Sequence, residues 1–146
     1  MESLDLYRAV ESKFDIAGSL AQQGFLAQRQ GEPARALALF KQSLPLHRNY
    51  PTSPWVTRGL GQLLIAYAAC ESWSVAARLV GVLGGARAVD AGPSLAPPEL
   101  SGRVRQAYEE AVARTRAALD EPAFGEETDA GAQMTREEAI EFALRR

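Results

Sequence analysis

Side chains that could carry out chemistry are few in this 146-residue chain. His47 is the single histidine and Cys70 is the single cysteine. A zinc site or an acid–base pair recruits several such groups, so one histidine predicts neither. We expect His47, which lies near an expected helix end, to face solvent or to bond a last-turn carbonyl. Cys70 lies in an apolar stretch, where we expect a buried, inert thiol and not a nucleophile.

The remaining chemical patterns are also weak. The acidic pairs Glu109–Glu110 and Glu137–Glu138 are neighbours in sequence, and neighbouring side chains on a helix diverge. The glycine-containing stretch 81–87 has no lysine, and no strand signal precedes it, so a phosphate-binding loop is not expected there. We interpret its glycines as sites of close helix packing. The sequence therefore predicts no enzyme, no cofactor and no metal site.

Composition narrows the class of protein further. Hydrophobic residues make up 47% of the chain, charged residues 23%, and the net charge is −2. Such a weakly acidic chain has no general attraction for nucleic-acid phosphates. No apolar run reaches the roughly 20 residues that span a bilayer, and the charged N-terminus does not resemble a signal peptide. With a lone cysteine, these features favour a cytoplasmic protein.

The elements that must position any site are expected to be helices. Strand signals are nearly absent, and Ala, Leu, Arg, Gln and Glu dominate, which predicts an all-α fold of about six to seven helices.

Residues 120–133 are expected to form a polar segment with at most a short helical turn around Phe124. We expect 1–119 to form helical repeats with a capping helix and 120–146 to be an acidic extension of the same domain. The predicted helices cover 4–11, 13–30, 33–48, 54–70, 73–89, 98–119 and a last segment that starts at Thr135.

Two helix pairs share one internal spacing. Twelve residues separate Gly24 from Ala36 and Leu64 from Ala76, and corresponding positions are 40 apart. This register follows the tetratricopeptide pattern, whose usual period is about 34 residues. Phe40 and Tyr67 occupy two of its aromatic positions. We therefore predict antiparallel helix pairs stacked as a tetratricopeptide-like, right-handed array, with an irregular helical bundle as the alternative.

The array predicts a groove lined by the first helix of each pair. Such a groove, with apolar pockets and a few hydrogen-bond donors, would suit an extended or helical peptide. Alternatively, a neighbouring helix already fills this face. The residues expected to line the groove are Ala21, Phe25, Gln28 and Arg29 from the first pair, and Arg58, Gln62, Ile65 and Ala69 from the second.

Two tryptophans and the N-terminal residues 4–25 are candidate contact surfaces for a partner molecule. Trp55 and Trp73 each start a helix, and either they pack under loops or one is an exposed anchor for a partner. Residues 4–25 would present an apolar face if nothing covers them, which predicts a possible homodimer. A small inducer in the groove, stacked on Phe25, Trp55 and Tyr67, is the alternative to a protein or peptide partner.

Several stretches together resemble one group of bacterial proteins. The segments 31–48, 77–89, 108–127 and 134–144, which include "ALDEPAF" and "TREEAI", are similar to the C-terminal ends of LuxR-type and related STAND ATPase transcriptional regulators. The resemblance implies a tetratricopeptide-like module that binds partners or inducers and restrains an ATPase. It also implies that the chain is a piece of such a regulator or a short relative. Its partner would then be another protein or the rest of its own regulator, with no direct contact to nucleic acid or membrane.

Overall fold

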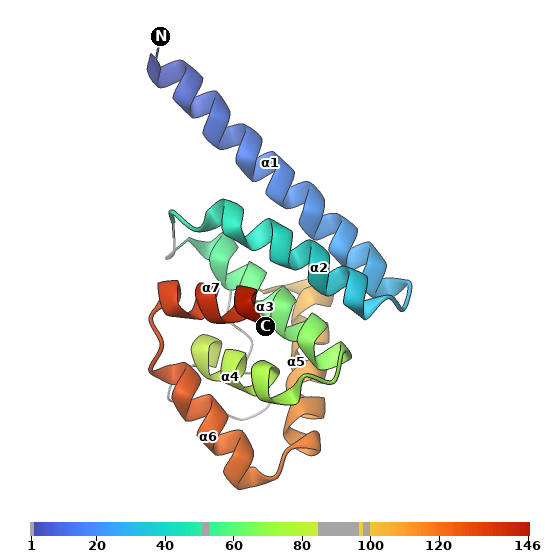
Figure 1. Ribbon diagram of the computed structural model, residues 1–146. Coiled ribbons are helices and arrows are strands. Elements are labelled where there is room, and N and C mark those ends of the chain that lie inside the picture. Colours follow the sequence, from blue (N-terminus) through green and yellow to red (C-terminus); the bar gives the residue numbers. More distant parts are fainter. Residues whose placement is uncertain (1, 51–52, 85–96, 98–99) are drawn as a thin grey trace.

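The computed structural model describes residues 2–50, 53–84, 97 and 100–146, apart from the side chains at positions 2, 3 and 7. These residues contain seven α-helices, one 3₁₀ helix and no strand, so the all-α prediction is confirmed (Figure 1). Stacking as a right-handed tetratricopeptide-like array stays a prediction. The helices are α1 Glu2–Arg29, α2 Pro33–Ser43, η1 Leu44–His47, α3 Pro54–Ala69, α4 Trp73–Gly84, α5 Gly102–Ala118, α6 Glu121–Ala132 and α7 Arg136–Arg145.

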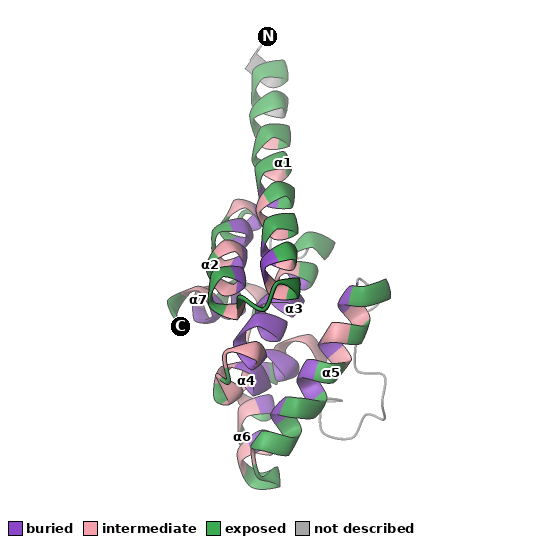
Figure 2. Ribbon diagram, turned by 90° about the vertical axis from the view of Figure 1, so that its right-hand side faces the viewer, coloured by how far each residue is buried: buried purple, intermediate pink, exposed green. Residues whose placement is uncertain are grey.

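The first helix is longer than the sequence predicts. Residues 4–11 and 13–30 were expected to form two helices, but α1 is continuous from Glu2 to Arg29. Nothing between the two stripes breaks a helix, because Ser12 and its charged neighbours are ordinary residues of a helix surface. The N-terminal half of α1 extends beyond the rest of the molecule, where its residues are mostly exposed (Figures 1 and 2). Leu4 and Leu6 are 52% and 68% exposed there.

The turns within the two helix pairs match at positions 40 residues apart. The amide of Glu32 donates to the carbonyl of Ala27, and the amide of Ser72 donates to that of Tyr67, both at 2.9 Å. The residue before each donor has left-handed backbone, with φ of 77° at Gly31 and 60° at Glu71. These are Schellman turns, in which a left-handed residue lets the chain leave the helix with its carbonyls bonded. The 40-residue register of the sequence therefore describes equivalent backbone positions.

The paired turns allow a matched test of this backbone requirement. Gly31→Ala should lower the free energy of unfolding by about 1 kcal/mol, because alanine has to adopt a left-handed φ. Glu71→Gly should raise it by about 0.5 kcal/mol, because glycine removes the Cβ that this conformation strains. Urea unfolding followed by circular dichroism measures both. Equal effects of the same sign would contradict the assignment of equivalent turns.

Helix ends carry the capping groups that the sequence indicates. Ser53 accepts the amide of Trp55 at the start of α3. At α7, Thr135 accepts the amide of Glu138, whose carboxylate accepts the amide of Thr135 at 2.9 Å. This reciprocal pair is a capping box, as predicted. Pro45 was expected to end or bend the helix predicted over 33–48, and the α-helix ends at Ser43 and continues as the 3₁₀ helix η1, which contains Pro45.

The segment after α5 corrects the sequence analysis. Residues 120–133 were expected to be mostly loop, but α6 spans Glu121–Ala132 and packs closely on α4. Asp120 caps this helix by accepting the amide of Ala123 at 2.8 Å. With Pro122 in the first turn, these are standard signals of a helix start that the glycine content obscured.

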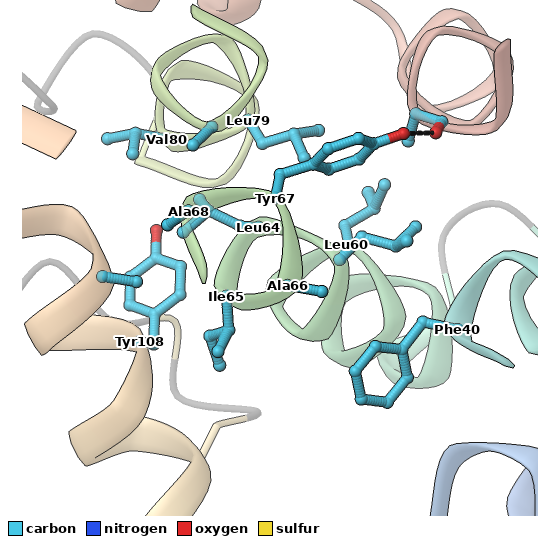
Figure 3. Close-up of a cluster of buried hydrophobic side chains, with 14 of the residues drawn as sticks. Phe40, Leu60, Leu64, Ile65, Ala66, Tyr67, Ala68, Leu79, Val80 and Tyr108 are labelled. Carbon is cyan, nitrogen blue, oxygen red and sulfur yellow. Dashed lines mark hydrogen bonds between the residues drawn. The ribbon is translucent and has the colours of Figure 1, made fainter. Parts of the chain in front are cut away.

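The core surrounds α3. Every residue from Leu60 to Ala68 is buried, because α2, α4, α5 and α7 pack around this helix (Figure 3). Tyr67 points to α7 and its hydroxyl donates to the carbonyl of Ala143. Ala36 and Ala76, the predicted helix-crossing positions, are both 0% exposed. α3 therefore holds the helix pairs and the C-terminal helices together.

Candidate functional site

A groove of about 610 Å³ lies between α1 and α3, with the end of α2 and η1 as its floor. This volume falls within the usual range for sites that bind small molecules or anchor side chains. The α1 wall includes exposed Asp15, Gly18 and Gln22, and the α3 wall includes exposed Trp55 and Arg58. The lining residues are Phe14, Asp15, Ala17, Gly18, Ala21, Gln22, Phe25, Ser43, Leu44, His47, Trp55, Arg58, Gly59, Gln62 and Val104.

Aromatic rings are stacked at one end of this groove. The His47 imidazole lies 5.1 Å from the Phe14 ring and 6.3 Å from the Trp55 ring, measured between centroids, with interplanar angles of 20° and 12°. Tyr50 meets Phe14 edge-on at 5.8 Å. One stack therefore joins α1, η1 and α3. Its outer member, Trp55, is 55% exposed.

His47 is not placed as the sequence predicted. It was expected to face solvent or to bond a last-turn carbonyl, but it is only 8% exposed, and its Nδ1 has no hydrogen-bond partner among the described residues. The 3₁₀ turn of η1 brings the ring beneath α1, where Phe14 covers it. Burial lowers the pKa of His47 below its ordinary value of 6.5, because desolvation disfavours the imidazolium.

This burial predicts how stability depends on pH. As pH falls through about 6.5, the unfolded chain takes up a proton before the folded chain does. The stability that His47 contributes is therefore present above pH 6.5 and is lost as the pH falls through its lower folded-state pKa. Urea unfolding from about pH 7.5 to about pH 5.5 should show a steeper loss for the wild type than for His47→Phe, which keeps a flat ring. Identical pH profiles would contradict a lowered pKa.

Polar groups sit on both walls and on the floor. Gln62 is 6% exposed and Ser43 is 8% exposed, and the Ser43 hydroxyl donates to the carbonyl of Ala17 at 2.8 Å. The Arg58 guanidinium lies 5.9 Å from the Trp55 ring centroid. Among the described residues, neither Arg58 nor Asp15 has an ion-pair partner. The groove thus offers opposite charges on its two walls.

The structure brings together four of the eight residues that the sequence assigned to a partner groove. The cavity is lined by Ala21, Phe25, Arg58 and Gln62. The four that do not line it are Gln28, Arg29, Ile65 and Ala69.

The excluded residues differ in their surroundings. Ile65 is 4% exposed on the side of α3 that faces Tyr108 of α5 (Figure 3). Gln28 is half-buried and Arg29 is exposed. The alternative that a neighbouring helix fills the face therefore holds at Ile65, and the groove stays open beyond it.

The expected stacking surface is also only partly present. Phe25 and Trp55 line the groove, whereas Tyr67 is buried against α7. Sequence reasoning missed Phe14 and His47. Phe14 lies three residues before Ala17 within the helix predicted over 13–30, so the spacing of that stripe was the signal that could have found it.

The side chains that the structure describes bear on two kinds of site, metal-ligating clusters and reactive thiols. They contain no group of three or more His, Cys, Asp or Glu side chains that could hold a metal ion. Cys70 is half-buried, and burial raises the pKa of its thiol, which disfavours the reactive thiolate. In the part of the chain that the structure describes, no helix has the length and apolar character to cross a membrane.

Comparison of the chain with protein-family models, with curated proteins and with solved structures finds no match. The residues of the groove are therefore the basis for its functional interpretation.

Proposed function

We propose that this chain is a non-catalytic interaction module that binds a segment of a partner protein in the α1–α3 groove. The observation that carries the proposal is an open groove with a buried aromatic floor and an exposed tryptophan–arginine pair at its rim. Tryptophan and arginine are the residues that most often dominate the free energy of protein association. The resemblance to LuxR-type and related ATPase regulators favours the rest of such a regulator as the partner.

A groove-filling variant tests this function without disturbing the core. Gly18 lies in the groove wall, is exposed, and has nothing within 4 Å of the position that a Cβ would take. Gly18→Trp should therefore fold normally and occupy the groove. Gly125→Trp is the matched control, because Gly125 also has open space around it but lies on α6.

The probe is a displayed library of random peptides of about twelve residues, selected against the full chain. Peptides that bind the wild type and Gly125→Trp but lose at least about tenfold in affinity for Gly18→Trp would support the groove as the binding site. The proposal fails if no peptide is selected, or if the selected peptides bind Gly18→Trp unchanged. Isothermal titration of the synthesised peptides gives the affinities.

A small-molecule sensor is the second candidate function. The buried polar side chains of His47 on the groove floor and Gln62 on the α3 wall favour it, because they could orient a compact ligand. A thermal-shift screen over small metabolites is its test, since a ligand of the folded state raises the melting temperature. Stabilisation of the wild type and of Gly125→Trp, but not of Gly18→Trp, would support a sensor over a peptide-binding module.

A further inference from the structure

We infer that the groove recognises a peptide segment with an aromatic side chain next to an acidic residue, with the aromatic ring against the exposed part of Trp55. This inference rests on the proposed function and names the chemistry of the partner. Its first support is the ring stack. Phe14 and His47 are in close contact, whereas the His47–Trp55 centroid distance of 6.3 Å is near the upper end for paired rings.

The outer end of the stack is the place for the incoming ring. Trp55 lies in the first turn of α3 and is 55% exposed, so part of its ring is accessible to a partner. A flat ring adds to a stack of near-parallel rings with more contact than a branched aliphatic side chain does. An aromatic anchor is therefore favoured over leucine or isoleucine.

The α3 wall supplies a second, polar preference. Gln62, which lines the groove on the α3 side, offers both a donor and an acceptor. Tryptophan and tyrosine carry an N–H or O–H that an aliphatic side chain lacks.

Charge then orients the segment across the groove. Arg58 on the α3 wall contacts the Trp55 ring and has no carboxylate within 4 Å among the described residues. An acidic residue beside the aromatic anchor would meet this guanidinium through charge-assisted hydrogen bonds. Asp15 on the opposite wall favours a basic residue on the far side of the segment.

The peptides selected on the wild-type chain provide the test. We expect their shared motif to contain Trp, Tyr or Phe with Asp or Glu within four residues, about one helical turn. Arg58→Glu should weaken the synthesised peptides by about tenfold, and Arg29→Glu, a matched reversal of an exposed arginine outside the groove, by less than about twofold. A purely aliphatic motif that Gly18→Trp still blocks would overturn this inference and leave the proposed function intact.

A direct readout comes from the ring protons of Trp55, one of two tryptophans in the chain, in NMR spectra. An aromatic ring stacked on Trp55 should shift these signals, and the same peptide with leucine at the aromatic position should not. Trp55→Leu should weaken the aromatic peptide by about tenfold and the leucine peptide by less than about twofold. Equal shifts from both peptides would contradict an aromatic site.

Indole-3-acetate serves as a probe of the same chemistry in a small molecule. We expect it to bind at least about a hundredfold more weakly than the peptide, because it lacks the flanking contacts. Comparable affinities would overturn the assignment of a peptide and favour a small aromatic acid as the ligand. If neither the peptides nor indole-3-acetate bind, the proposed function is contradicted as well.

Discussion

Gly131→Ala is expected to lower the free energy of unfolding by about 2–3 kcal/mol, even though alanine is the better helix former. Gly131 lies where α6 crosses α4, and a Cβ there would overlap the carbonyl oxygen of Arg78. In the reverse direction, a Cβ at Gly81 of α4 would overlap the carbonyl oxygen of Thr128. Both obstacles are backbone atoms, so no side-chain rotation relieves them and the helices have to separate.

A glycine on the same helix provides the control. Gly125 has nothing within 4 Å of its Cβ position, so Gly125→Ala should raise the free energy of unfolding by about 0.5–1 kcal/mol through helix propensity alone. Urea unfolding followed by circular dichroism gives both values. If the two variants differ by less than about 0.5 kcal/mol, the helices do not approach as closely as the structure shows.

Separation of the helices would also disturb a polar contact between them. The Arg78 guanidinium donates to both carboxylate oxygens of Glu127, at 3.0 and 3.3 Å, and lies 4.9 Å from the centroid of the Phe142 ring. A shift of α6 lengthens the bidentate pair, whose strength depends on geometry. The expected loss of stability in Gly131→Ala therefore includes a weakened Arg78–Glu127 ion pair as well as the steric overlap.

The same glycines explain why α6 was not predicted. Glycine weakens a helix when only local propensity is considered, so residues 120–133 were interpreted as mostly loop. At Gly131 the missing side chain is what permits the approach to α4, a contact with a helix some 50 residues earlier in the chain. Only the start of the helix, with Asp120 and Pro122, is encoded locally.

The matching turns of the two helix pairs were predictable because their determinants are local. Gly31 at a left-handed turn, Pro33 in the next first turn, and a small residue at Ala36 are all visible in sequence. The same positions forty residues later carry Glu71 and Ala76, so spacing revealed the equivalence even where residue types differ. Hydrogen bonds at matching positions confirm equivalent turns.

The groove was predictable only in part. The 40-residue register of the two helix pairs assigned Phe25, Arg58 and Gln62 to one face, and these three residues line one cavity. Register could not show that α5 would occupy the face around Ile65, because that packing joins segments far apart in sequence. The place of His47 depended on the 3₁₀ turn that follows Ser43. Pro45 predicted an end or bend of the helix there, but not the direction in which the chain would continue.

Phe40→Ala should cost about 3–5 kcal/mol, the usual range for removing a buried phenylalanine. Phe40 is 2% exposed and its ring packs against Gly24, so it fills the interface between α1 and α2. Because α1 forms one wall of the groove, the loss should also increase amide hydrogen exchange in residues 17–27 of α1. Leu26→Ala, at a site on α1 that is 54% exposed, should change stability by less than about 0.5 kcal/mol.

A second substitution at Gly24 makes the expectation specific to this contact. A Cβ on Gly24 would lie 2.7 Å from the Phe40 ring, so Gly24→Ala should destabilise the wild type by about 1 kcal/mol. In the Phe40→Ala background the ring is gone, and the same change should instead stabilise by about 0.5–1 kcal/mol through helix propensity. This reversal of sign is a coupling energy between the two positions. Additive effects in the double-mutant cycle would mean that Phe40 does not pack on Gly24, and that another contact holds the α1 wall of the groove in place.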